Sequence, residues 1–147
     1  MPEERNIMDL FEELRDKKIL LIDDDESIRD SLSMFFQGEG IHINTLETAE
    51  EGMKALENQH YDIIITDYRL PGMDGLSFLK HIHELCPDSF KIFLTTYGSK
   101  EEFTAATQLG VDEYIVKPFT TKLIKDALSR VVSKKRSDSG SSYIRKG

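Results

Sequence analysis

The sequence predicts an α/β fold in which five helices cover a doubly wound, five-stranded parallel sheet, with a short extra helix at the N-terminus. Four short apolar runs, rich in β-branched and aromatic residues, predict strands at residues 19–22, 61–66, 92–95 and 114–116, and a weaker fifth run lies at 41–44. The four runs are continuous rather than alternating, which is typical of strands buried on both faces. Because helical patterns separate the runs and crossovers between parallel strands are right-handed, the doubly wound topology is expected.

The segments between the runs carry the start, stop and packing signals of helices. Thr48 and Ser99 each precede a Glu by three residues, as in a capping box, where both side chains satisfy free backbone donors at the helix start. Gly110 is a stop signal. Helical spacing also predicts two core stripes, namely Ile28, Leu32 and Phe35 after the first strand and Leu123, Ala127 and Val131 after the last.

The length of 147 residues fits one domain, since domains commonly contain ~100–200 residues. We predict an N-terminal extension over residues 1–17, a folded domain over 18–132 and a flexible linker or tail over 133–147. The tail is rich in Ser, which is typical of a disordered linker. The short helix of the extension carries an apolar stripe made of Ile7, Leu10, Phe11 and Leu14. The stripe predicts that this helix packs on the folded domain; the alternative is a contact with a second copy or another partner.

Composition argues against several classes of protein. The net charge is −8, whereas a general nucleic-acid-binding surface needs clustered positive charge. No apolar run approaches the ~20 residues of a membrane span, and the acidic start does not resemble a secretory signal. Cys86 is the single cysteine, so no internal disulfide can form. We therefore expect a cytoplasmic protein that binds neither nucleic acid nor membrane.

Polar side chains follow the predicted strands at the points where these strands end. Asp23 and Asp24 follow the run at 19–22, Asp67 follows the run at 61–66, and Thr95 and Lys117 close the runs at 92–95 and 114–116. Because the carboxyl ends of parallel strands meet at one edge of a doubly wound sheet, these side chains are expected to converge.

Such a cluster suits phosphoryl transfer. Carboxylates held together repel one another unless a cation compensates, and hard oxygen ligands select Mg²⁺. A lysine and a hydroxyl beside them would bind an anion, and a carboxylate can serve as the nucleophile. The alternative is that these aspartates cap helices. That explanation suits Asp25, which opens a helix, but not Asp67, because Asp74 is the better helix start after the intervening turn residues.

Over residues 18–132 the chain resembles a response-regulator receiver domain of the CheY-like superfamily. The segments that carry this resemblance, in this order and spacing, are ILLIDDDES at 19–27, DYRLPGMDG at 67–75, LTTYG at 94–98 and KPFT at 117–120. The resemblance implies a flavodoxin-like sheet with the strand order 2-1-3-4-5.

The resemblance also implies a reaction. Asp67 would be the phosphoacceptor, taking a phosphoryl group from a phosphohistidine on a sensor histidine kinase or phosphotransfer protein. Mg²⁺ would be held by Asp23, Asp24, Asp67 and the backbone carbonyl of Arg69. The domain would then be a signalling switch that catalyses only its own phosphorylation and dephosphorylation, not an enzyme acting on an external substrate.

Further residues acquire expected roles in the same way. Lys117, Thr95 and Thr96 would bind the phosphoryl group, and a cis peptide bond would precede Pro118. Thr96 is larger than the Ala or Gly common at its position, which would narrow access for partners. Thr95 and Tyr114 would form the switch, with the tyrosine swinging from an exposed to a buried position.

The switch would change one surface, made by the helix after Ser99, the strand at 114–116 and the final helix. That surface would control a downstream output domain or protein, and a homodimer could form through it. Arg69 and Tyr97 would flank the path of the attacking water, so their bulk predicts slow self-dephosphorylation.

Two other functions compete with this one. A phosphorylation-independent adaptor could use the same fold, although every expected site residue is present. A Mg²⁺-dependent phosphohydrolase of the haloacid-dehalogenase type is suggested by Asp23-x-Asp25 after the first strand. Against the hydrolase stand the short chain and the lack of a late acidic pair. The phosphorylated aspartate discriminates between them, since the hydrolase would use Asp23 and the receiver Asp67.

Overall fold

The computed structural model describes residues 7–96 and 99–145. Its elements in chain order are α1 (Ile7–Leu14), β1 (Lys18–Ile22), α2 (Glu26–Gly38), β2 (His42–Leu46), α3 (Ala49–Asn58), β3 (Ile63–Asp67), β4 (Arg69–Leu70), β5 (Met73–Asp74), α4 (Gly75–Leu85), β6 (Phe90–Thr95), α5 (Lys100–Gln108), β7 (Glu113–Val116) and α6 (Thr121–Arg145). The alternation of strands and helices is the one that the apolar runs predict.

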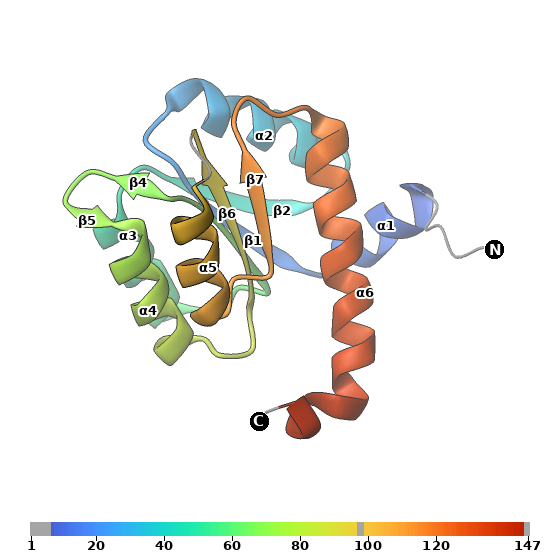
Figure 1. Cartoon of the computed structure of the whole chain (residues 1–147). Helices are drawn as coiled ribbons and strands as arrows, with labels where there is room; N and C mark the ends of the chain where they lie inside the picture. Colours follow the sequence, from blue (N-terminus) through green and yellow to red (C-terminus); the bar gives the residue numbers. More distant parts are fainter. Residues whose placement is uncertain (1–6, 97–98, 146–147) are drawn as a thin grey trace.

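The main sheet has five parallel strands in the order β2-β1-β3-β6-β7 (Figure 1). These strands are the five predicted from the sequence, so both the fold class and the predicted order 2-1-3-4-5 are confirmed. The antiparallel pair β4-β5 was not predicted. Each of its strands has two residues, which is too short for any hydrophobic periodicity to show.

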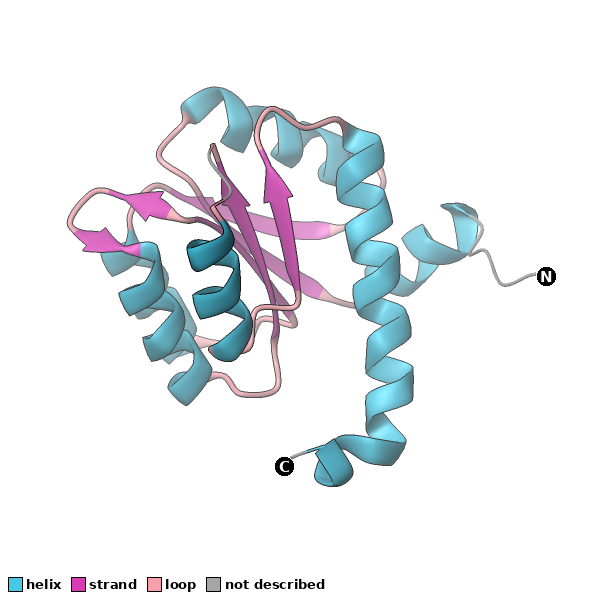
Figure 2. Ribbon diagram, in the orientation of Figure 1, coloured by secondary structure: helices cyan, strands magenta, loops and turns pink. Residues whose placement is uncertain are grey.

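Helices cover both faces of the sheet (Figure 2). α1, α2 and α6 pack on one face, and α3, α4 and α5 pack on the other. Side chains of β1 alternate between the two cores, with Ile19 and Leu21 in the first and Leu20 and Ile22 in the second. The continuous apolar run therefore reflects burial on both faces, as predicted.

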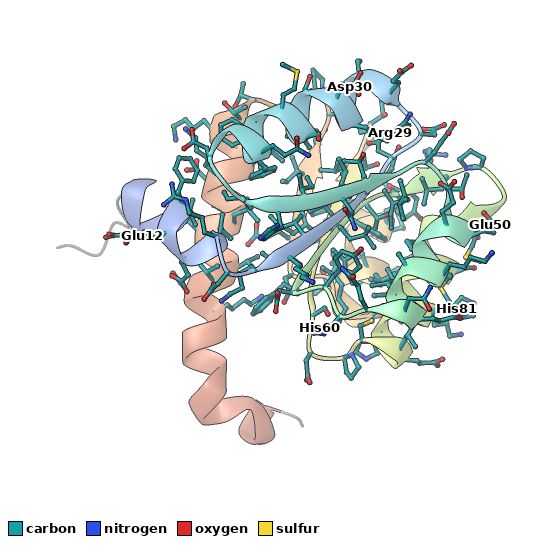
Figure 3. The ribbon with its side chains drawn as sticks, turned by 180° about the vertical axis from the view of Figure 1, so that it is seen from behind. Glu12, Arg29, Asp30, Glu50, His60 and His81 are labelled. Carbon is teal, nitrogen blue, oxygen red and sulfur yellow. The ribbon has the colours of Figure 1, made fainter. Side chains whose placement is uncertain are left out.

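The N-terminal helix α1 packs on the body of the domain. Leu10, Phe11 and Leu14 are buried in the core that α2 and α6 also cover. The ring of Phe11 lies edge-on to that of Phe35, with 6.1 Å between the ring centroids. Glu12 projects from the outer side of α1 (Figure 3). These three residues of the predicted apolar stripe are thus part of the core, which confirms the first of its two interpretations.

The helix starts largely follow the sequence signals. Asp25 caps α2 and Asp74 caps α4, both through side-chain bonds to backbone N–H groups. Thr48 forms the predicted capping box with Glu51. Ser99 caps α5 by accepting a hydrogen bond from the backbone of Glu102. These caps leave Asp67 as a strand-end carboxylate that opens no helix.

Two features of α6 differ from the sequence prediction. Leu123 is 46% exposed, whereas Ile124, Ala127 and Leu128 are buried, so placing Leu123 in the core stripe was wrong. A helix turns every 3.6 residues, and a strict spacing of four therefore drifts off the buried face. The helix also continues to Arg145 through residues that the composition predicts as a linker. The domain boundary at 132 stays a prediction.

Within residues 7–96 and 99–145, no helix combines the length and apolar character needed to cross a membrane.

Candidate functional site

Three carboxylates meet at the carboxyl edge of the main sheet. Asp23 and Asp24 follow β1, and Asp67 ends β3, the strand paired with it. One oxygen from each lies within 4.8 Å of the others. Arg29 of α2, labelled in Figure 3, donates a hydrogen bond of 2.9 Å to the carbonyl oxygen of Asp23 and so fastens the end of β1 to the helix that follows.

The ammonium of Lys117 lies between two of these carboxylates. Its Nζ is 2.8 Å from Asp23 Oδ2 and 3.0 Å from Asp67 Oδ2. Lys117 directly follows β7, and its backbone N–H donates to the carbonyl of Thr95. The bond between Lys117 and Pro118 is cis, as expected. Three strand ends of the sheet thus converge on one charged cluster.

Burial makes the electrostatics of this cluster strong. Asp23 is fully buried and Asp67 is 6% exposed, whereas Asp24 faces solvent. Burial raises the pKa of Asp23, whereas the adjacent Lys117 ammonium and a hydrogen bond from the backbone N–H of Asp25 act to lower it. Burial alone lowers the pKa of Lys117, but its ion pairs with Asp23 and Asp67 outweigh that effect and raise the pKa.

The donor set fits a hard divalent cation. Asp23 Oδ2 accepts no hydrogen bond of good angle from the described residues, although Lys117 Nζ lies close to it. A buried carboxylate oxygen without a well-aligned hydrogen bond is strongly stabilised by a cation that binds it directly. The three side chains offer only carboxylate oxygens, and Mg²⁺ prefers oxygen ligands. Asp23, Asp24 and Asp67 could therefore hold such an ion.

A second polar group lies next to the cluster, around Tyr114 of β7. The Tyr114 hydroxyl donates to Glu102 Oε1 at 3.1 Å and also hydrogen-bonds with Thr95. Burial, and then the bond to Glu102, raise the pKa of Tyr114 to about 12. The other oxygen of Glu102 lies 3.5 Å from Nη2 of Arg69. Glu102 thus connects the strand after Asp67 with β7.

Comparison with known protein families gives a match that is consistent with this geometry. The family model for the response regulator receiver domain matches residues 19–129. The chain belongs to this family. Receiver domains are signalling switches rather than enzymes with an external substrate, so the phosphohydrolase alternative is not favoured.

Two sequence relatives of this receiver domain are named as transcriptional regulators. It is 34% identical over 114 residues to the transcriptional regulatory protein GlrR of Escherichia coli, covering 78% of this chain and 25% of the relative. It is 34% identical over 113 residues to the DNA-binding transcriptional regulator NtrC of Klebsiella pneumoniae, covering 77% of this chain and 24% of the relative. The chain therefore spans about a quarter of the length of these curated relatives.

Solved receiver structures share its fold. A CheY-like receiver domain protein from Methanospirillum hungatei JF-1 superposes with a TM-score of 0.79 at 31% identity, covering 83% of this chain and 98% of that one. The non-phosphorylated HemR receiver domain from Leptospira biflexa gives 0.75 at 28% identity, covering 80% of this chain and 94% of that one. The flavodoxin-like fold that the sequence predicts is thereby confirmed.

Most of the residues predicted for the site of this receiver domain do converge. Asp23, Asp24, Asp67 and Lys117 form one cluster, and buried Thr95 ends β6 beside it. Their individual roles stay predictions.

The remaining predicted residues are placed less centrally. Thr96 is exposed and lines a cavity of about 600 Å³ beside Lys117. The backbone N–H of Arg69 donates to Asp67 Oδ1, while the guanidinium of Arg69 reaches Glu102. Tyr114 is half-buried. Tyr97 lies outside the described residues.

The sequence did not predict the contacts that Glu102 and Arg29 make near the site. Glu102 has a sequence signal only as a helix-start residue, and the ion pair it makes spans separate elements of the fold. Arg29 has no signal beyond its charge.

Proposed function

We propose that Asp67 accepts a phosphoryl group from a phosphohistidine on a sensor histidine kinase or phosphotransfer protein, in a Mg²⁺-dependent reaction. The observation that carries this proposal is the Lys117 ammonium, held 3.0 Å from a nearly buried Asp67 within an acidic cluster. A lysine so placed pairs with whatever negative charge is added to that carboxylate.

The chain's own residues divide the work of this transfer. A carboxylate oxygen of Asp67 attacks phosphorus, and the bond from phosphorus to the histidine nitrogen breaks, returning its electron pair to the imidazole. Lys117 neutralises charge on the transferred group. Asp23, Asp24, Asp67 and the backbone carbonyl of Arg69 would hold Mg²⁺, which would supply further positive charge beside the oxygens of the transferred group. Because little covalent chemistry is required, alignment and charge neutralisation account for the reaction.

The phosphorylated state would be read at the surface formed by α5, β7 and α6. Thr95 would turn its hydroxyl to the new phosphoryl oxygen and leave Tyr114 to settle further inward. Three large apolar side chains of this surface are already exposed, namely Phe103 at 50%, Val116 at 48% and Leu123 at 46%. They provide the contact area for a downstream domain or partner, or for a homodimer.

The donor would approach Asp67 across the cavity beside Lys117. Its walls include apolar groups, among them Ile28, Pro118 and Phe119. Thr96 lies at the same cavity and would narrow the entry. Like other switches of this kind, the domain would catalyse only its own phosphorylation and dephosphorylation, in the cytoplasm where such kinases present their phosphohistidine.

Mapping the phosphorylated residue tests this proposal. After incubation with acetyl phosphate and Mg²⁺, borohydride reduction converts an acyl phosphate to a stable alcohol that peptide mass spectrometry can locate. We expect the modification at Asp67. Modification at Asp23 would support the hydrolase alternative, and a chain left unmodified while a known receiver is labelled would support the adaptor alternative.

A further inference from the structure

One carboxylate links the strand that follows the phosphoacceptor to the switch tyrosine. Glu102 lies in the first turn of α5, and its side chain is only 16% exposed. Its Oε1 accepts a hydrogen bond of 3.1 Å from the Tyr114 hydroxyl. Its Oε2 lies 3.5 Å from Nη2 of Arg69. Both oxygens are thus engaged, each by a different element of the fold.

One partner of Glu102, Arg69, lies directly beside the acidic cluster. The backbone N–H of Arg69 donates to Asp67 Oδ1 at 3.1 Å, so the base of this side chain is fixed beside the phosphoacceptor. The guanidinium nevertheless extends toward Glu102 and lies 5.9 Å from the ring centroid of Tyr68. On the other side of Glu102, Tyr114 packs against Phe103 at 5.4 Å between ring centroids.

We propose that Glu102 is a positioning residue that holds the Arg69 guanidinium away from Asp67 in the unphosphorylated domain, and that a phosphoryl group on Asp67 competes with Glu102 for Arg69. This inference rests on the proposed function, because it needs Asp67 to be the phosphoacceptor.

The exchange is physically favourable on several grounds. The Arg69 side chain is 60% exposed, and an ion pair with one exposed partner and a separation of 3.5 Å is weak, so Arg69 can be released from Glu102 easily. A phosphoryl group adds negative charge and oxygen acceptors, and a guanidinium can bind two of those acceptors at once. The backbone bond from Arg69 to Asp67 already sets the side chain at the correct end of β3.

The exchange has two consequences. Arg69 drawn onto the phosphoryl group would cover it from attacking water, which slows self-dephosphorylation. Glu102, relieved of Arg69, would keep only its bond to Tyr114 among the two contacts described above. Phosphorylation would therefore reach the surface of α5 and β7 through Glu102 as well as through Thr95.

The lifetime of the phosphoryl group tests the proposal. Glu102→Gln removes the negative charge that attracts Arg69 but keeps an oxygen that can accept from Tyr114. Glu101→Gln is the matched control, since Glu101 is exposed on the same helical turn and the change in charge is identical. We expect Glu102→Gln to lengthen the lifetime about two- to fivefold, the range equivalent to one weak ion pair, and Glu101→Gln to leave it unchanged.

A second background separates positioning from a general structural effect. In Arg69→Ala, which has no guanidinium to release, adding Glu102→Gln should not change the lifetime. An equal lengthening in both backgrounds, or equal lifetimes for Glu102→Gln and Glu101→Gln, would overturn the proposal while leaving Asp67 as phosphoacceptor. Absence of any label on Asp67 in the natural chain would overturn the proposed function and this inference together.

Discussion

Two lysines at opposite ends of the sheet, Lys91 buried and Lys117 half-buried, show how differently this fold uses the same charge. Lys117, at the carboxyl edge, lies between the carboxylates of Asp23 and Asp67. Lys91 lies near the start of β6 and is 2% exposed, and its Nζ donates to the backbone carbonyl of Cys86 at 2.8 Å. The Lys117 ammonium faces carboxyl side chains, and the Lys91 ammonium faces the backbone carbonyls that follow α4.

The surroundings shift the two lysines in opposite directions. Burial lowers the pKa of Lys91, and the charge of Asp112 opposes this only in part. Burial also acts on Lys117, but its ammonium donates to Asp67 and pairs with Asp23, and these two carboxylates reverse the effect of burial and raise the pKa. A buried ammonium on neutral carbonyls fixes a loop in place. An ammonium between carboxylates can instead pair with a new anion that arrives beside it. The carboxylate partners of Lys117 therefore distinguish the carboxyl edge of the sheet from the edge that holds Lys91.

The largest expected contrast is in phosphorylation. Lys117→Ala should slow labelling of the domain by acetyl phosphate by about 10²-fold, because a preorganised positive charge is lost from the transfer site. Lys91→Met should stay close to the natural rate, because Lys91 is at the other edge. Time courses of labelling for the three proteins provide the comparison, which breaks down if folded Lys91→Met is slowed as much as Lys117→Ala.

For the stability of the fold, Lys91 should matter more than it does for phosphorylation. Lys91→Ala is expected to lower the free energy of unfolding by about 2–4 kcal/mol, since it leaves a cavity and deprives the Cys86 carbonyl of its partner. The control is Lys122→Ala, where the side chain is 79% exposed and the loss should stay within about 0.5 kcal/mol. Urea unfolding measures both, and similar losses for the two variants would remove the structural role of Lys91.

The acidic cluster should impose a cost that Mg²⁺ relieves. Asp23→Asn removes a buried charge beside Asp67 and should raise the free energy of unfolding by about 1 kcal/mol in the presence of a chelator. Mg²⁺ should raise the melting temperature of the natural chain but not that of the variant. Equal Mg²⁺-induced shifts for both proteins would place the ion elsewhere.

The smallest expected effect is on the pH dependence of stability. Because burial lowers the folded-state pKa of Lys91 below its ordinary 10.5, the unfolded chain binds more protons between those two values. The natural chain should therefore gain stability relative to Lys91→Met as the pH rises through that window. Urea unfolding of the natural chain and Lys91→Met at neutral and alkaline pH measures this gain. If the free energy of unfolding of the natural chain falls relative to that of Lys91→Met as the pH rises, the predicted sign is wrong.

The sequence predicted best what depends on local order. The strand runs, the caps at Asp25 and Asp74, and the aspartates after β1 and β3 are all readable because chain neighbours determine them. Lys117 was placed correctly for a further reason, since parallel strands bring their carboxyl ends to a common edge.

What escaped prediction depends on contacts between distant segments. Lys91 looks like a polar interruption at the edge of an apolar run, and only the fold shows its ammonium on the carbonyls after α4. Glu102 has a helix-start signal, whereas its contacts with Arg69 and Tyr114 are set by the packing of α5. The pair β4-β5 consists of strands too short to leave a pattern.

The most direct test of the central claim is intact mass after incubation with acetyl phosphate and Mg²⁺, for the natural chain and Asp67→Ala in parallel. The cluster around Lys117 predicts a single added phosphoryl group on the natural chain, lost in the variant and lost when Mg²⁺ is chelated. An adduct of equal yield on Asp67→Ala, or one indifferent to chelation, would contradict the assignment of this end of the sheet as the phosphoryl-accepting site.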